Sequence, residues 1–208
     1  MDVFKKIERY KIVPVTVIDK IEDVIPLGKT LIDAGLPVIE ITFRTAIAAE
    51  AIKKISEELP ELLIGAGTVL TIQHIHDAIN AGSHFIVTPG FNPSIVDYCI
   101  ENSIPIIPGL NSPTFIEWGL ERGLNIFKFF PADISGGERM LKALSGPYPQ
   151  VRFIPTGGVN NSSLVKYLNL ENVIACGGSW IVKIDLIKSG KFEKVKELIK
   201  LALDLIKK

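Results

Sequence analysis

A single lysine interrupts an otherwise apolar run in the second half of the chain. The run covers residues 126–130, and its middle residue is Lys128. Because side chains alternate along a β-strand, Phe127 and Phe129 would share one face and Lys128 would point to the other, the interior of a closed sheet. Burial disfavours the charged ammonium, and a neutral amine is the form that attacks a carbonyl to give a Schiff base. The pattern indicates a nucleophilic lysine; the alternative is a lysine whose buried stem carries its ammonium to solvent.

A second run, residues 38–44, alternates apolar and polar side chains. Glu40, Thr42 and Arg44 fall on one face of the expected strand, and the apolar residues fall on the other. A charged residue in the middle of a barrel strand is costly unless it is paired or functional. We predict that Glu40 is a catalytic carboxylate and that Arg44 lies near the mouth of the site. The alternative is an interior salt bridge between these two residues.

Two glycine pairs follow the last two expected strands. One is Gly157-Gly158, directly after Thr156, and the other ends at Gly178, directly before Ser179. In barrels the loops after strands 7 and 8 frequently bind a phosphate group through bare backbone N–H groups. The two pairs therefore favour a phosphate site, to which Ser179 would add a hydroxyl; the alternative is a pair of simple turns.

A third glycine motif, Gly65-Ala66-Gly67, precedes Thr68 at the end of the third expected strand. It resembles the start of a dinucleotide-binding fingerprint, but the position of the third glycine is Leu70, so that interpretation fails. Glycines at the carboxyl end of a barrel strand instead let a ligand approach the backbone. Thr68 would then present its hydroxyl at the mouth.

Short β-branched runs alternate with longer amphipathic ones along the whole chain. Strands are expected at residues 12–17, 38–43, 62–67, 84–88, 105–109, 126–130, 151–155 and 173–177. Helices are expected at residues 22–33, 46–59, 72–81, 93–102, 113–122, 138–144, 162–168 and 192–206, with N-caps at Asn92, Ser112 and Asn161. This even repeat predicts one α/β domain over residues 1–208, a (β/α)8 TIM barrel with an extra N-terminal helix at residues 1–10.

The composition excludes several classes of protein. Lys and Arg number 23 and Asp and Glu number 23, so the chain lacks the basic excess that nucleic acid or an anionic membrane attracts. No signal peptide or spanning segment is expected, and Cys99 and Cys176 fit reduced thiols, so we expect a cytoplasmic protein. The histidines follow no metal-binding pattern, so neither a metal nor another cofactor is expected.

Taken together, nine segments resemble the aldolases of 2-keto-3-deoxy-6-phosphogluconate (KDPG) and 4-hydroxy-2-oxoglutarate (KHG). The resemblance covers nearly the whole chain, in residues 12–17 (IVPVTV), 38–45 (VIEITFRT), 64–70 (IGAGTVL), 86–90 (IVTPG), 106–109 (IIPG), 127–132 (FKFFPA), 145–149 (SGPYP), 151–159 (VRFIPTGGV) and 176–182 (CGGSWIV). It implies a class I aldolase on a (β/α)8 barrel, a homotrimer, and a small phosphorylated keto acid as substrate.

The resemblance also implies roles for individual residues. Lys128 matches the Schiff-base lysine of the family, and Glu40 matches its general acid and base. The substrate-binding set matched by motif and by place on the strand ends is Arg44 and Thr68 at the pyruvyl carboxylate, Pro89 and Phe130 in the pocket wall, and Thr156, Gly157, Gly158, Gly178 and Ser179 around the phosphate.

One departure from the family and several alternatives stand beside this assignment. Some members carry an arginine just after the apolar part of the first strand, whereas this chain continues Val15-Thr16-Val17-Ile18. Within the family, the galactonate analogue of KDPG or unphosphorylated KHG are alternative substrates. Outside it, a phosphosugar isomerase or epimerase on the same barrel, or a non-catalytic sugar-phosphate binding protein, would share the glycine-rich site but have no use for Lys128.

Overall fold

Parallel strands form the centre of the molecule. The computed structural model describes residues 2–207, in which the strands are β1 (Ile12–Thr16), β2 (Val38–Thr42), β3 (Leu63–Gly67), β4 (Phe85–Val87), β5 (Ile106–Ile107), β6 (Gly109–Leu110), β7 (Ile126–Phe129), β8 (Arg152–Pro155) and β9 (Cys176–Gly178). One sheet has the order β5-β4-β3-β2-β1-β9, and a second has the order β6-β7-β8. Every strand pair is parallel, so all carboxyl ends lie at the same edge.

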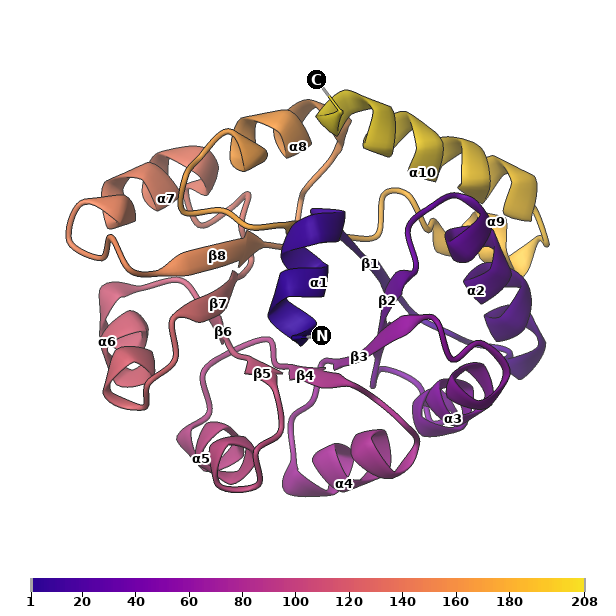
Figure 1. Cartoon of the computed structure of the whole chain (residues 1–208), viewed down its shortest axis with the longest axis horizontal. Coiled ribbons are helices and arrows are strands. Elements are labelled where there is room, and N and C mark those ends of the chain that lie inside the picture. The colour runs from indigo at the N-terminus through magenta and orange to yellow at the C-terminus, as the bar shows by residue number, and fades with distance from the viewer. Residues whose placement is uncertain (1, 208) are drawn as a thin grey trace.

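Apart from the first one, the helices lie outside the strands, and most of them connect one strand to the next (Figure 1). They are α1 (Val3–Tyr10), the 3-10 turn η1 (Ile21–Asp23), α2 (Val24–Asp33), α3 (Ala48–Glu58), α4 (Ile72–Asn80), α5 (Pro93–Glu101), α6 (Pro113–Glu121), α7 (Gly137–Ser145), α8 (Asn161–Leu168), α9 (Ile184–Lys188) and α10 (Phe192–Ile206). This α/β arrangement of parallel strands and crossover helices is the one that the alternating pattern predicts.

The first helix lies at the end of the molecule where the strands begin. Helix α1 is followed at once by β1, and Figure 1 shows it over the middle of the strands. Its Ile7 is completely buried in the core, Phe4 and Tyr10 pack partly buried against it, and its exposed residues are Lys5, Glu8 and Arg9. The helix thus covers the amino ends of the strands and leaves the carboxyl ends open. Met1, where the expected helix begins, and Lys208, the last residue of the expected domain, lie outside the described residues.

Two expected strands differ from the structure, and one helix was not expected, each for an identifiable reason. The fifth expected strand is split into β5 and β6 because Pro108 between them has no N–H to donate. The last expected strand begins later, at Cys176, because residues 173–175 join their neighbour only through the bridge between Phe153 and Val173. Helix α9, only five residues long, is too short to produce a periodic pattern and was not expected.

The predicted helix caps were partly right. Asn92 caps α5 by accepting a hydrogen bond from the N–H of Ser94 at 3.1 Å. Ser112 occupies the N-cap position of α6 without a side-chain hydrogen bond. Helix α8 is capped by Asn160 rather than by Asn161, which leaves the Asn161 side chain free to bind elsewhere.

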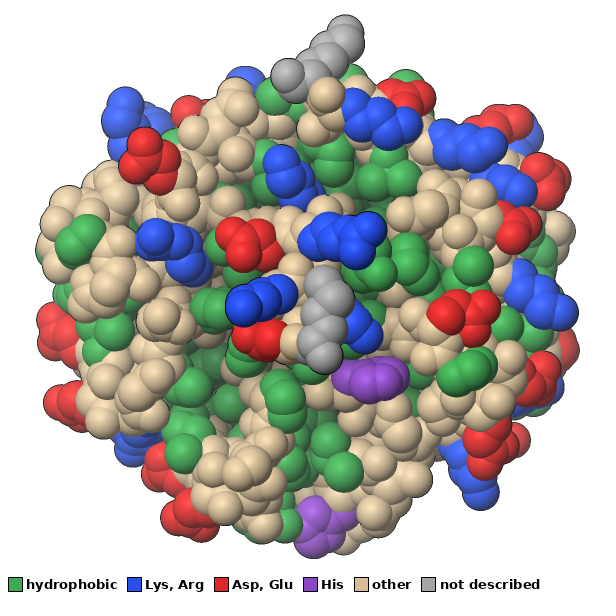
Figure 2. Space-filling model, in the orientation of Figure 1, with side chains coloured by type: hydrophobic (Ala, Val, Ile, Leu, Met, Phe, Trp, Pro, Cys, Tyr) green, Lys and Arg blue, Asp and Glu red, His purple; other side chains and the backbone are tan. Residues whose placement is uncertain are grey.

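The surface carries both signs of charge. Figure 2 shows Lys, Arg, Asp and Glu side chains interspersed over the face that bears α1. This distribution agrees with the equal numbers of acidic and basic residues and gives no broad single-sign field on that face. Among residues 2–207, no helix has the length and apolar character that crossing a membrane requires.

Candidate active site

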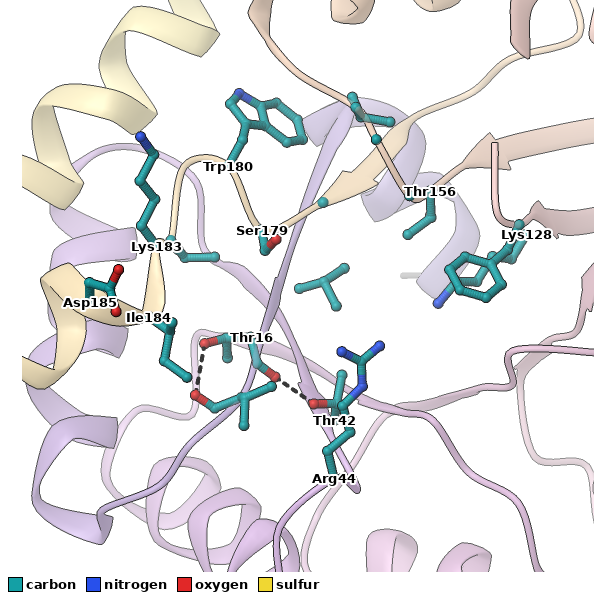
Figure 3. Close-up of a pocket in the computed structure, with 18 residues that line it drawn as sticks. Thr16, Thr42, Arg44, Lys128, Thr156, Ser179, Trp180, Lys183, Ile184 and Asp185 are labelled. Atoms are coloured by element: carbon teal, nitrogen blue, oxygen red, sulfur yellow. Dashed lines mark hydrogen bonds between the residues drawn. The ribbon is translucent and has the colours of Figure 1, made fainter. Parts of the chain in front are cut away.

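A cavity of about 540 Å³ opens at the carboxyl ends of the strands. The predicted site residues that line it are Arg44, Lys128, Phe130, Thr156, Gly157, Gly158, Gly178 and Ser179. They come from β2, β7, β8, β9 and the turns that follow these strands. Figure 3 shows Lys128 and Arg44 on one side of the cavity and Ser179 and Trp180 on the other. The ligand sites of parallel α/β proteins lie at this same edge.

Lys128, which lines the cavity, forms a buried pair with Glu40, which lies beyond the cavity lining beside a small internal void. The Lys128 Nζ lies 3.4 Å from the Glu40 Oε1, and the two side chains are 7% and 4% exposed. The Lys128 ammonium also lies 5.3 Å from the centroid of the Phe130 ring. Two buried charges are costly to desolvate unless they meet each other, and this pair does. An amine beside a carboxylate can pass protons between them, as nucleophilic catalysis by a lysine requires.

A glycine next to the pair makes room for its carboxylate. Gly67 on β3 pairs with Thr42 on the neighbouring strand β2, and a methyl group at Gly67 would come within 2.7 Å of the Glu40 Cδ and Cγ. The glycine motif of β3 was expected to admit a ligand to the backbone. Its second glycine instead admits the Glu40 side chain.

Arg44 and Thr68 meet at the rim. The Arg44 Nε donates to the Thr68 Oγ1 at 3.4 Å, and Arg44 is exposed. Thr68 has a φ of 55°, an uncommon conformation for a β-branched residue and one that often occurs at functional sites. The alternative of an interior Glu40–Arg44 salt bridge is wrong, since the ion pair of Glu40 in the described chain is with Lys128.

The other end of the cavity is built from backbone rather than from side chains. Gly157 and Gly158 have φ values of 94° and 80°, which only glycine adopts at little cost. The Thr156 hydroxyl donates to the Ile154 carbonyl at 3.3 Å and occupies the space that a side chain at position 177 would fill. Ser179 follows β9 and is exposed. Such a turn offers N–H groups to an anion.

Comparison with known proteins agrees with this geometry. The sequence model of the family described as KDPG and KHG aldolase matches residues 3–198. A 2-dehydro-3-deoxy-phosphogluconate aldolase of Treponema pallidum is 45% identical over 204 residues, 98% of this chain and 97% of the relative. The KHG/KDPG aldolase of Escherichia coli K12 is 39% identical over 193 residues, 93% and 91% of the two chains.

A solved structure is similarly close. The KDPG aldolase of Legionella pneumophila, crystallised with pyruvate captured as a covalent carbinolamine, is 40% identical and superposes with a TM-score of 0.94 over 97% of this chain and 98% of the other. This chain belongs to the KDPG and KHG aldolase family. The family predicted from the motifs is confirmed, and with it the prediction that the protein is a lyase of the aldolase class.

Several residues of this aldolase line the cavity without having been predicted. Besides Trp180, they include Thr16 and Thr42 on the first two strands and Lys183 and Asp185 beyond β9. The Thr42 hydroxyl donates to the Thr16 carbonyl at 2.9 Å, which ties the two strand ends together (Figure 3). The shared face of residues 40, 42 and 44 was a usable signal for Thr42. The segment around Lys183 gave none, because it follows no period.

Asn161 holds the aromatic wall of the cavity in place. The Trp180 Nε1 donates to the Asn161 Oδ1 at 2.7 Å, and Trp180 packs over Gly178. The side chain expected to cap α8 therefore connects the start of α8 with the segment that follows β9.

Other expected residues lie away from the cavity. Pro89 lines a separate groove of about 260 Å³ with Leu70 and Phe91. His74 and His76 lie on α4, and His84 precedes β4 at the opposite end of the strands. In residues 2–207, no three His, Cys, Asp or Glu side chains are grouped so that they could hold a metal ion. Both cysteines are buried and free, and burial raises the pKa of Cys99 to about 12.

Proposed function

We propose that this chain is a class I aldolase that cleaves KDPG to pyruvate and glyceraldehyde 3-phosphate and also accepts KHG, which it cleaves to pyruvate and glyoxylate. The observation that carries this proposal is the buried Lys128–Glu40 pair at 3.4 Å, in which Lys128 lines the cavity and Glu40 lies behind it. An isomerase or a passive binding protein has no use for such a lysine. The names of the relatives support the choice of substrate.

Lys128 is the nucleophile of the proposed reaction. Its neutral amine adds to the C2 ketone to give a carbinolamine, and loss of water gives a protonated imine. The imine accepts the electron pair of the C3–C4 bond as that bond breaks. Glu40, through a water molecule, takes the proton of the C4 hydroxyl, so the aldehyde leaves as glyceraldehyde 3-phosphate. The enamine takes a proton at C3 and is hydrolysed to pyruvate, which frees Lys128.

The remaining predicted residues bind the substrate in this proposal. Arg44 and Thr68 hold the pyruvyl carboxylate at the end of the cavity that contains Lys128, the keto-acid end. Phe130 and Pro89 form the wall of this end. The phosphate is held at the opposite end of the cavity, the glycine end, by Thr156 and the backbone of Gly157, Gly158, Gly178 and Ser179. The contact between Arg44 and Thr68 supports the first assignment, and the left-handed turn at residues 157 and 158 supports the second. Pro89 lines a separate groove, so in this proposal it would affect the substrate without lining the cavity.

The architecture and assembly complete the proposal. Residues 1–208 form a single domain, a closed (β/α)8 barrel with an N-terminal helix. Closure is supported by the single proline between β5 and β6 and by the bridges Phe153–Val173 and Thr156–Gly177 on the side of β8. The barrel works as a homotrimer in the cytoplasm. Exposed apolar side chains such as Ile134, which is 84% exposed, support the association of subunits. The free cysteines support a reducing compartment.

Borohydride trapping tests the proposed chemistry. We expect that reduction of the protein with sodium borohydride in the presence of pyruvate, followed by peptide mass mapping, locates a reduced pyruvyl adduct on Lys128. Absence of an adduct on folded protein would contradict the Schiff-base mechanism. A cleavage assay that compares KDPG, its galactonate analogue and KHG then ranks the substrates.

A further inference from the structure

The cations that line the cavity are unevenly distributed. Those of the described residues are Arg44, Lys128 and Lys183. The first two already form hydrogen bonds at the keto-acid end: the Lys128 Nζ donates to the Glu40 Oε1 and the Arg44 Nε to the Thr68 Oγ1, each over 3.4 Å. Figure 3 shows Lys183 at the opposite side, beyond Ser179 and near Trp180. It is therefore the cation available to the glycine end.

We infer that Lys183 determines the preference of the enzyme for phosphorylated substrates, an inference that rests on the proposed function. A phosphate monoester carries a charge of roughly −1.5 to −2 near pH 7, whereas backbone N–H groups supply only partial positive charge. The first strand ends in Thr16, which adds no charge. With a net charge of zero, the protein as a whole does not attract an anion, so a local cation has to do so.

The Lys183 side chain is free to reach the phosphate. Its backbone is anchored, because the N–H of Leu186 donates to the Lys183 carbonyl at 3.0 Å. Its ammonium takes part in none of the ion pairs formed within residues 2–207, whereas Lys188 nearby is held 2.7 Å from Asp19. In the structure the Lys183 side chain runs beside Trp180, on the side away from Lys128 (Figure 3). A flexible four-carbon stem on a fixed backbone allows the ammonium to swing onto an arriving phosphate.

Asp185 opposes this cation. It lines the same side of the cavity two residues later, and Figure 3 shows the two side chains leaving the segment in different directions. A carboxylate near a phosphate site weakens anion binding by like-charge repulsion. Removal of the Asp185 charge should therefore act in the opposite direction to removal of the Lys183 charge.

The test compares Lys183→Ala, Lys183→Arg and Asp185→Asn with the wild type. Binding of glycerol 3-phosphate is measured by calorimetry, and kcat/KM is measured for KDPG and for KHG. We expect Lys183→Ala to weaken glycerol 3-phosphate binding about tenfold and to lower the KDPG/KHG ratio of kcat/KM by a similar factor, chiefly through KM. Lys183→Arg should restore most of both, and Asp185→Asn should tighten binding. Lys200→Ala, which removes an exposed lysine of α10 outside the cavity, is the matched control.

The outcomes separate this inference from the proposed function. Unchanged glycerol 3-phosphate binding by Lys183→Ala, or equal losses on KDPG and KHG, would overturn the role of Lys183. A wild-type protein that binds glycerol 3-phosphate but cleaves neither keto acid would contradict the aldolase proposal, while the binding series would still decide the role of Lys183. Superimposable melting curves for wild type and variants ensure that folding does not produce the differences.

Discussion

One end of the cavity is formed by charged side chains and the other by glycine backbone. The keto-acid end depends on two buried side chains, Lys128 and Glu40, that point inward from β7 and β2. The glycine end depends on the left-handed turn at Gly157 and Gly158 and on the end of β9 at Gly177 and Gly178, where side chains are absent. In the proposed function, bond cleavage takes place at the first end and phosphate recognition at the second. Substitutions should therefore affect kcat at one end and KM at the other.

The largest expected effect is that of removing the lysine. Lys128→Met keeps an unbranched stem but removes the amine, so no imine forms and turnover should fall by about a thousandfold or more. Glu40 would remain 4% exposed without its partner, and an uncompensated buried charge destabilises a protein by about 3–5 kcal/mol. KDPG cleavage and the midpoint of urea unfolding measure the two effects separately.

A second variant separates the chemical loss from the stability loss. Lys128→Met combined with Glu40→Gln removes both charges, so it should recover stability but not activity. If the single Lys128→Met variant cleaved KDPG at a rate near that of the wild type, the keto-acid end would lose its assigned role.

Glu40→Gln should have the next largest effect. Glutamine keeps the size of the side chain but cannot accept the substrate proton, so kcat should fall by about 10²–10³. Because Lys128 remains, borohydride should still trap pyruvate on the protein. Steady-state cleavage and the rate of trapping are the two measurements. Glu138→Gln, on the exposed start of α7, is the control. Equal losses in cleavage and trapping would mean that Glu40 mainly positions the lysine.

The same contrast explains what the sequence could predict. The inward placement of Lys128 and Glu40 was predictable because a strand has a period of two, so a charge on the inward face stands out among apolar residues. The location of the glycine pairs at the strand ends was predictable from the order of the expected strands. The role of Gly67 was not, because the side chain that fills its space, Glu40, belongs to another strand. Lys183 was missed for a related reason, since a loop residue is positioned by tertiary contacts that leave no periodic signal.

Adding a methyl group at Gly157 tests whether the glycine end of the cavity binds the phosphate. Gly157→Ala would force a residue with a φ of 94° to carry a Cβ, which would also lie 3.3 Å from the Phe130 ring and the Pro131 Cα. We expect the turn to shift, so that KM for KDPG rises about tenfold or more while kcat changes little. Gly35→Ala, with a φ of 82° and nothing within 4 Å, is the control for backbone strain alone. If kcat fell instead of KM rising, the division between the two ends would be wrong.

The smallest expected effect lies at the far end of the strands and should leave both ends of the cavity unchanged. His84, before β4, accepts a hydrogen bond from the Ile64 N–H at Nδ1, 3.1 Å away. Its pKa is lowered from 6.5 chiefly by burial and in part by the charge of Lys6. The native state thus favours neutral imidazole, and its contribution to stability is complete above the ordinary pKa and lost as pH falls through the lowered one.

Urea unfolding at pH 7.5 and pH 5 measures this loss. The wild type should lose more stability between the two values than His84→Gln, by less than about 1 kcal/mol because His84 is still partly exposed. KM for KDPG at pH 7.5 should be the same in both proteins, since His84 lies at the opposite end from the cavity. His76→Gln, on the exposed side of α4, controls for the loss of a histidine. Equal pH sensitivity of wild type and His84→Gln would assign the acid loss to other groups, whereas a changed KM would mean that the two ends of the strands are coupled.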